Sequence, residues 1–238
     1  MTLSNRKILR TLLCLLAGTL YAVCLSACDA KEPLSENRDA EIESPVIAND
    51  LSNQKVTAIA EDTQGHIWIG TFRGLNKNNV HDYHQYFCTD DSLGLPDNQI
   101  THLLRDSKNR FWVGTVNGVC LYTDKDNFRI IPIEADNKNV RQILEDRNGR
   151  IFLNTGFQLY AYHPREEKIT CVLPEISPGN AFYAQCHIAP DNNLWVMTST
   201  GLRCYDPSTL QLKESVALSG YPYYSYLHNN ELWITGNH

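Results

Sequence analysis

The sequence predicts an all-β fold, a β-propeller of four-stranded antiparallel blades, from three observations. One large aromatic residue recurs at spacings of 44, 40, 43 and 38 residues, a similar turn precedes it, and a glycine often starts the segment after it. Short segments without a helical pattern fill each period, and four short strands in every repeat are typical of a propeller blade. We expect the aromatic anchors on the second strand of each blade, packed between neighbouring blades. The anchors are Trp68, Trp112, Phe152, Trp195 and Trp233.

The number of repeats predicts an incomplete ring. The repeat cores lie near 56–79, 100–123, 140–163, 183–206 and 223–238, so about four to five blades are present and the fifth stops part-way. Closed propellers usually contain 4–8 blades. Two explanations remain open: a truncated gene product, or a short propeller whose N-terminal strand completes the last blade. A β-sandwich is the alternative fold, but it does not require an aromatic at one fixed repeat position.

The strands and turns of one unit follow from its residue pattern. Over residues 56–61, Val, Ala and Ala alternate with Thr, Ile and Glu, and the segment is short, which predicts a strand. Residues 62–65, Asp-Thr-Gln-Gly, predict a turn, because an Asp side chain bonds forward to backbone N–H groups and Gly tolerates a positive φ. Residues 66–71 form the second predicted strand and carry the anchor. Gly74 starts the third, and a fourth follows, as residues 168–173 do in the third unit.

The N-terminus predicts export. Three basic residues within the first ten precede an uncharged run over 11–28, which is the pattern of a secretion signal. The run ends in Leu25-Ser26-Ala27-Cys28, which resembles a bacterial lipobox whose Cys28 is acylated after cleavage. Ordinary cleavage after a small residue and an uncleaved anchor are the alternatives. Each predicts an exported chain, either periplasmic or held at a membrane.

An acidic segment separates the signal at 1–28 from the repeats at 51–238. Residues 29–50 hold seven acids against two bases, together with two prolines and few apolar residues, which predicts a solvated tether. The whole chain carries a formal charge of −6. Nucleic-acid binding needs clustered Lys and Arg at the phosphates, so we expect no nucleic-acid partner.

The sequence predicts neither a metal, nor a cofactor, nor a catalytic residue. The five cysteines after the signal are not spaced as C-x-x-C, so they indicate small buried residues rather than a metal site. Export permits disulfides, but the spacing demands none. No nucleophile, zinc-protease, dinucleotide or P-loop motif is present. We therefore expect a protein that is not an enzyme.

The repeat resembles a known family. The pattern D-x-x-G-x-[IFL]-W-[IV]-G-T-x-x-G-[LV] in the first two units is similar to the two-component regulator propeller repeat. Residues 51–53 and 94–100 resemble the segment that leads into the first strand of that repeat. The resemblance covers about 51–238, although the third unit departs from it at Phe152, Asn154 and Gln158, and the fourth at Ala189 and Met197.

This resemblance implies a ligand-binding sensor module. In such proteins the repeats form the periplasmic input of hybrid histidine kinases, often tuned to polysaccharide fragments. It implies a small carbohydrate ligand, and a kinase region as partner if the chain is a fragment, since no kinase core is expected here. The alternatives are a stand-alone glycan-binding lipoprotein held at the membrane, or a propeller lyase or glycosidase.

Two polar residues are the candidates for ligand binding. The residues between Thr and Gly vary most from unit to unit, and such turns line a propeller face. Arg73 and Asn117 occupy this turn in the first two units and could bind an anionic or hydroxylated ligand. A tyrosine-rich segment, 221–226, either stacks on sugar rings or forms a strand with core and edge tyrosines.

Overall fold

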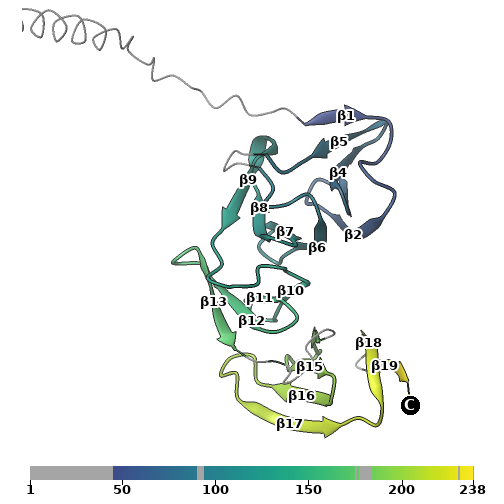
Figure 1. The fold of residues 1–238 in the computed structure, drawn as a ribbon. Coiled ribbons are helices and arrows are strands. Elements are labelled where there is room, and N and C mark those ends of the chain that lie inside the picture. Colours follow the sequence, from purple (N-terminus) through teal and green to yellow (C-terminus); the bar gives the residue numbers. More distant parts are fainter. Residues whose placement is uncertain (1–44, 90–93, 175, 177–183, 230, 238) are drawn as a thin grey trace, which may run out of the picture. The chain divides into compact units, whose positions relative to one another are not determined.

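The computed structural model describes residues 45–89, 94–174, 176, 184–229 and 231–237, and they form an all-β structure (Figure 1). Cys28, with the rest of the predicted signal and residues 29–44 of the tether, lies outside the described residues. Besides strands, the described part contains one 3-10 turn, η1 (Asp124–Asp126). Nothing helical in this part has the length and apolar character needed to cross a bilayer.

The strands form four successive antiparallel sheets, here called blades 1 to 4, followed by a C-terminal hairpin. Blade 1 contains β2 (Val56–Glu61), β3 (Ile67–Thr71), β4 (Gly74–Asn79) and β5 (Asp82–Tyr86); blade 2 contains β6 (Ile100–Arg105), β7 (Phe111–Thr115), β8 (Gly118–Tyr122) and β9 (Phe128–Ile131); blade 3 contains β10 (Gln142–Glu145), β11 (Ile151–Asn154), β12 (Leu159–His163) and β13 (Lys168–Leu173); blade 4 contains β14 (Gln185–Ile188), β15 (Leu194–Thr198), β16 (Gly201–Tyr205) and β17 (Leu212–Ala217); the hairpin contains β18 (Tyr221–His228) and β19 (Glu231–Asn237). The predicted four-stranded blades are confirmed.

The ring is open among the described residues (Figure 1). The short strand β1 (Val46–Ala48) pairs with β5, with Val46 opposite Gln85, and so adds a fifth strand to blade 1. β18 and β19 pair only with each other. One of the two explanations for the incomplete number of repeats was that an N-terminal strand completes the last blade. β1 does not do so, because it pairs with β5 of blade 1.

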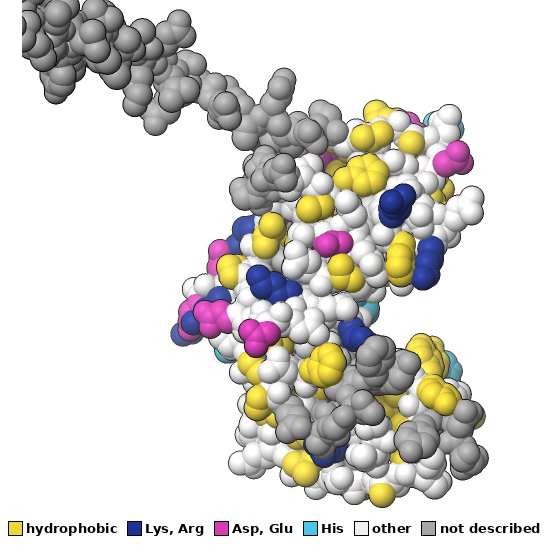
Figure 2. All heavy atoms as spheres, in the orientation of Figure 1, with side chains coloured by type: hydrophobic (Ala, Val, Ile, Leu, Met, Phe, Trp, Pro, Cys, Tyr) yellow, Lys and Arg dark blue, Asp and Glu magenta, His cyan; other side chains and the backbone are white. Residues whose placement is uncertain are grey.

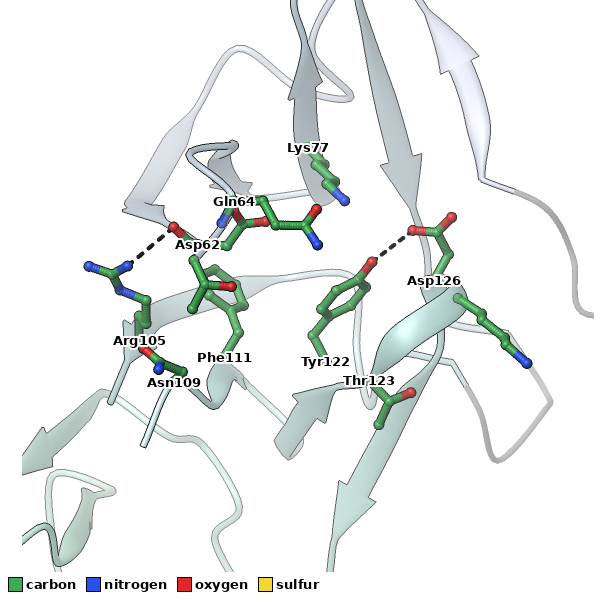
Figure 3. A pocket seen from close by; sticks show the side chains of 11 residues that line it. Asp62, Gln64, Lys77, Arg105, Asn109, Phe111, Tyr122, Thr123 and Asp126 are labelled. Atoms are coloured by element: carbon green, nitrogen blue, oxygen red, sulfur yellow. Dashed lines mark hydrogen bonds between the residues drawn. The ribbon is translucent and has the colours of Figure 1, made fainter. Parts of the chain in front are cut away.

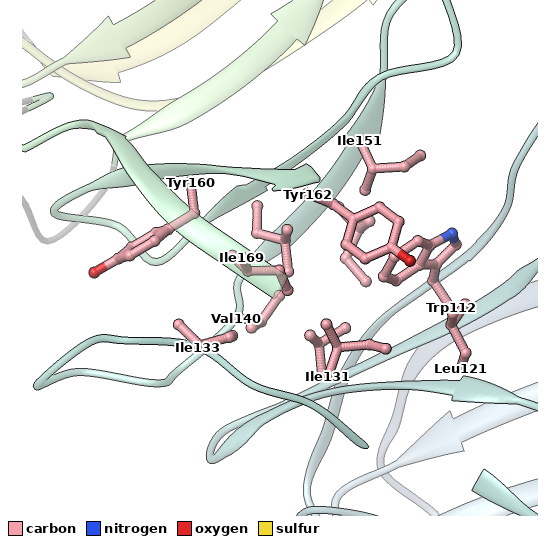
Figure 4. Packing of buried hydrophobic residues seen from close by; sticks show 12 residues of the cluster. Trp112, Leu121, Ile131, Ile133, Val140, Ile151, Tyr160, Tyr162 and Ile169 are labelled. Carbon is pink, nitrogen blue, oxygen red and sulfur yellow. The ribbon is translucent and has the colours of Figure 1, made fainter. Parts of the chain in front are cut away.

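Successive blades are joined by shared hydrophobic cores. The first strands of neighbouring blades, β2, β6, β10 and β14, lie side by side and are here called the inner strands. Between blades 2 and 3, Trp112 and Leu121 lie against Ile151 and Tyr162 (Figure 4). The rings of Trp112 and Tyr162 meet edge to face, with centroids 4.9 Å apart. Equivalent cores join blades 1 and 2 and blades 3 and 4.

The five aromatic anchors all lie on the second strand of their blade or hairpin, but their burial differs. Trp68, Trp112 and Phe152 are buried, and each contributes to the core shared with the next blade. Trp195 is half-buried, and Trp233 on the C-terminal hairpin is 62% exposed. An anchor is therefore buried where a complete blade follows it.

An aspartate in the turn before the second strand binds the anchor directly. In blade 2, the buried Asp106 carboxylate accepts hydrogen bonds from the backbone N–H groups of Lys108 and Arg110. The same carboxylate accepts the indole N–H of Trp112 at 2.8 Å. Asp62 and Trp68 repeat this bond at 2.9 Å. One acid thus closes the turn and orients the ring that fills the core between blades.

Candidate functional site

A pocket of about 430 Å³ opens where the inner strands begin. We call it the channel pocket. The starts of β2, β6, β10 and β14 line it, together with the second-to-third strand turns of blades 1 and 2 and the segments that enter β6 and β10. Its lining residues are Thr57, Phe72, Gln99, Ile100, Thr101, Val116, Asn139, Arg141, Gln142, Ala184 and Gln185.

Irregular pairing at the start of the inner strands gives this pocket polar side chains. The register of β2 shifts between Val56 and Ala58, and that of β6 shifts between Ile100 and His102. Thr57 and Thr101 occupy these irregular positions and line the pocket. β-Bulges of this kind re-aim a side chain and are common beside functional sites.

Two buried polar atoms of the pocket have no hydrogen-bond partner among the described residues. They are the hydroxyl oxygen Oγ1 of Thr57 and the amide oxygen Oδ1 of Asn139. Leaving a buried polar group unpaired costs about 1–3 kcal/mol. A bound molecule with hydroxyl or amide groups would supply the missing partners.

Glutamines fix the wall of the pocket. The backbone N–H of Cys186 donates to Oε1 of Gln142 at 2.9 Å, and Nδ2 of Asn154 donates to the same oxygen at 2.8 Å. Gln185 holds the same repeat position one blade later, and its Oε1 accepts the backbone N–H of Ser225 at 2.6 Å. Gln142 thus links β10 to β14 and Gln185 links β14 to β18, so hydrogen bonds between successive sheets hold the pocket wall.

Arg141 supplies the single charged group among the described lining residues. It takes the repeat position that Thr57 and Thr101 occupy in blades 1 and 2. Its side chain lies against Gly156, where an added Cβ would come within 2.9 Å of the Arg141 Nε. Gly156 has a φ of +91°, a conformation that favours glycine. Gly156 therefore allows the turn its positive φ and leaves room for the Arg141 side chain.

The two residues predicted to bind ligand lie beside this pocket and are not among its lining residues. Arg73 and Asn117 are exposed in the predicted turns, and their backbone N–H groups donate to the hydroxyls of Thr71 and Thr115. The residues just before them, Phe72 and Val116, line the pocket instead. The predicted turns thus contribute Phe72 and Val116 to the pocket, and Arg141 was not predicted, although a charge where the first two blades have Thr was a usable signal.

The remaining predicted features are spread over the structure. Cys120, Cys186 and Cys204 are buried, and Cys88 and Cys171 are exposed. Burial raises the pKa of the Cys186 thiol to about 12, so this thiol is inert at neutral pH. The described residues contain no group of three or more His, Cys, Asp or Glu placed to hold a metal ion.

The described lining of the channel pocket consists mainly of amide, hydroxyl and apolar side chains. The described lining residues include no carboxylate, imidazole or thiol, the groups that most often serve as acid, base or nucleophile. They do supply amides, hydroxyls, one guanidinium and the ring of Phe72, which is 37% exposed. Such a mixture recognises a polar molecule that has an apolar face.

Comparison with known families identifies the repeat of this open propeller. Residues 50–73 and 94–117 match the family model described as two component regulator propeller. These segments include the anchors Trp68 and Trp112 and the turns that contribute Phe72 and Val116 to the channel pocket. The predicted resemblance is thereby confirmed, and the chain carries two repeats that match this family. No curated protein matches the chain.

Solved structures share the fold. The extracellular domain of a protein described as a hybrid two component system of B. thetaiotaomicron is 20% identical, with a TM-score of 0.63 over 76% of this chain and 26% of that domain. This chain therefore spans about a quarter of that domain. Virginiamycin B lyase from Staphylococcus aureus is 18% identical, with a TM-score of 0.61 over 80% of this chain and 67% of the lyase. A gluconolactonase from Xanthomonas campestris is 12% identical, with a TM-score of 0.53 over 76% of this chain and 69% of the enzyme.

Proposed function

We propose that the chain is the ligand-binding input of an exported sensor in a two-component system of the hybrid histidine kinase type. The observation that carries this proposal is the channel pocket, in which buried polar atoms lack partners beside a guanidinium. The match of two repeats to the two component regulator propeller family supports the signalling role. In a full-length sensor, a kinase region would be the partner that receives the signal.

The ligand in this proposal is a carbohydrate fragment. A sugar presents hydroxyl groups that both donate and accept, which suits Thr57, Asn139 and the pocket amides. It also presents apolar C–H faces, which pack well on an aromatic ring such as Phe72. The Nζ of Lys55 lies 3.6 Å from the centre of the Phe72 ring.

Binding to the channel pocket can be tested by calorimetric titration with a panel of oligosaccharides. Arg141→Ala should weaken binding of the responding saccharide about 10- to 100-fold, since a hydrogen bond from a charged donor is lost. Thr57→Val keeps the shape of the side chain and should weaken it about 3- to 10-fold. Arg73→Ala is the matched control, because Arg73 lies in the same turn as Phe72 but does not line the pocket.

Other results would change the proposal. If Arg73→Ala weakens binding and Arg141→Ala does not, the site lies on the outer turns rather than in the channel pocket. Chromatography of the saccharide after incubation should show no product. Cleavage would instead favour a propeller lyase or glycosidase, and saccharide binding without any kinase region in the gene would favour a stand-alone glycan-binding lipoprotein.

The proposal places the chain outside the cytoplasm, attached to a membrane by a lipid on Cys28. Its support is the basic start, the uncharged run and the small residues before Cys28. Cys28→Ser should abolish incorporation of a fatty-acid probe and leave the precursor uncleaved. Unchanged labelling, or a mature N-terminus at another residue, would contradict lipid attachment at Cys28.

A further inference from the structure

A second pocket, of about 620 Å³, lies between blades 1 and 2 (Figure 3). It is lined by residues 62–64 and Asn109, in the turns that follow the inner strands β2 and β6, and by Tyr122, Thr123, Lys125 and Asp126 around η1. The channel pocket is lined where these inner strands begin, so the two pockets lie at opposite ends of the strands. We call the second one the Lys77 pocket.

Lys77 is an exception within its repeat position. It lies directly opposite the anchor Trp68 in the pairing of β3 with β4. The residues opposite the anchors of blades 2, 3 and 4 are Leu121, Ala161 and Cys204. This repeat position, which packs between blades, therefore holds an apolar residue in blades 2 to 4 and a half-buried lysine in blade 1.

The cations of this pocket have no acidic partners. Lys77, Arg105 and Lys125 line it, and none of the three forms an ion pair with a described residue. The Lys77 Nζ lies 5.2 Å from the ring centre of Trp68 and 5.5 Å from that of Tyr122. Arg105 donates through Nη1 to the backbone oxygen of Asp62 at 3.3 Å.

The two described carboxylates of the pocket already have hydrogen-bond partners, and the His66 Nδ1 also lies 3.1 Å from Oδ2 of Asp62. Asp62 accepts hydrogen bonds from the backbone N–H groups of Gln64 and His66 and from the Trp68 indole. Asp126 accepts the hydroxyls of Tyr86 and Tyr122 through one oxygen, at 2.6 Å and 3.0 Å. Among the described lining residues, three cations and two carboxylates leave an excess positive charge in a partly enclosed space, which favours an anion.

The walls of the pocket suit an anion that also has a flat or apolar part. Phe111 and Tyr122 form the aromatic side, and both rings pack on Trp68 with centroid distances of 5.0 Å and 4.7 Å. The amide of Gln64 and the amine of Lys77 lie toward the same open space as the Tyr122 ring (Figure 3). A fixed aromatic wall beside a cation and an amide can bind the ring and the charge of one small molecule.

We infer that the Lys77 pocket binds a small organic carboxylate, with the Lys77 ammonium as its counter-ion. The carboxylate lies toward Lys77 and Gln64, and the apolar part of the ligand packs on Phe111 and Tyr122. This site is separate from the channel pocket and does not depend on the proposed sensor function.

The test is titration of the full chain with sodium D-glucuronate and sodium benzoate, with D-glucose as the neutral match for glucuronate. At least one carboxylate should bind saturably and at least tenfold more tightly than glucose. Lys77→Leu introduces the residue that blade 2 uses at the same position, so the variant should keep the wild-type melting temperature and lose at least tenfold in affinity for the carboxylate. Lys108→Leu removes an exposed lysine outside the pocket and should bind as the wild type does.

Several outcomes would overturn this inference. Failure of both carboxylates to bind, or unchanged binding by a folded Lys77→Leu variant, would do so. Binding of inorganic phosphate alone would show a simple ion site and no organic carboxylate. Arg141→Ala should leave carboxylate binding unchanged, because Arg141 belongs to the channel pocket. Loss of binding in that variant would assign the carboxylate to the channel pocket.

Discussion

Each of the first three blades has a buried aspartate in the turn before its second strand, next to the core shared with the following blade. In blade 3 the anchor is Phe152, which has no N–H group, and the Asp146 carboxylate instead accepts the Nε–H of Arg150 at 2.7 Å. In blade 4 the turn begins with Ala189, which has no acceptor in its side chain, and Trp195 is half-buried. Blades with an aspartate at the start of this turn therefore have a fully buried anchor, and blade 4, which has Ala189 there, has a more exposed one.

The hydrogen bonds of the Asp106 carboxylate predict that Asp106→Ala is strongly destabilising. The substitution leaves the Trp112 indole N–H and the Arg110 guanidinium without their carboxylate partner in a buried setting. Removing one partner of a buried pair costs about 3–5 kcal/mol in free energy of unfolding. Urea unfolding followed by tryptophan fluorescence measures the change. Asp191→Ala, at the exposed acid of the blade 4 turn, is the control and should cost less than about 1 kcal/mol; equal costs would contradict the role given to Asp106.

A half-buried histidine on inner strand β6 predicts a dependence of stability on pH. The Nδ1 atom of His102 is buried and has no partner among the described residues, and burial lowers the pKa of the ring to about 4. In the unfolded chain the ring titrates near 6.5, so between these values only the unfolded state binds the proton. This contribution to stability is complete above pH 6.5 and is lost as the pH falls toward 4.

The size of this loss follows from the shift, and is about 3 kcal/mol. His102→Gln removes the titration and keeps a polar side chain of similar length. We expect the free energy of unfolding of the wild type to fall more steeply than that of the variant between pH 7 and about pH 4.5. Parallel curves for the two proteins, measured by urea unfolding in a series of buffers, would disprove a buried neutral His102.

At the scale of the strand, burial of an anchor depends on the blade that follows. Trp112 is fully buried between blades 2 and 3, whereas Trp233 on β19 is 62% exposed. Trp112→Ala should therefore lower the free energy of unfolding by about 3–5 kcal/mol, through lost packing and a residual cavity. Trp233→Ala should cost less than about 1 kcal/mol. Thermal and urea unfolding of both variants measure the difference, and a larger cost for Trp233→Ala would contradict packing between blades as the source of stability.

The elements were predictable from the sequence because the repeat places the same signals in each unit. An acidic turn, an aromatic strand and a glycine start recur together in the first two units and in part in the third and fourth, so the units support one another's assignment. The lining of the channel pocket was predictable only to the level of the turn. Phe72 and Arg73 are neighbours in one turn, yet only Phe72 lines the channel pocket, because successive side chains of a turn point in different directions.

Contacts between units were the least predictable part. Arg141 joins a pocket with Thr57, Thr101 and Gln185, which lie one or more repeats away in the chain. The pattern within a single unit carries no information on such neighbours. β1 was missed for a similar reason, since its partner β5 lies beyond three intervening strands and three residues are too few for a clear strand pattern.

At the scale of the whole molecule, the first blade and the C-terminal hairpin each expose a face of the kind that packs between blades elsewhere in the chain. Ile59 of blade 1 is 66% exposed, while its equivalents in blades 2, 3 and 4 are buried against the preceding blade. Those equivalents are Leu103, Ile143 and Cys186. At the other end, Tyr226 and Trp233 lie opposite each other on β18 and β19 and are 55% and 62% exposed. Hydrophobic side chains at the surface of both ends are visible in Figure 2.

These exposed faces predict that the chain, freed of residues 1–28, associates head to tail in solution. The anchor side of the hairpin in one copy would pack on the Ile59 side of blade 1 in another, as complete blades pack within the chain, because burying both apolar faces is favourable. Sedimentation velocity should show mass rising with concentration. Replacing Tyr226 and Trp233 together by Ser should reduce association without unfolding the chain. Val80→Ser is the control, since Val80 is 86% exposed in the β4–β5 turn, away from both faces. A monomer at every concentration, or equal association of all three proteins, would show that these faces do not recognise each other.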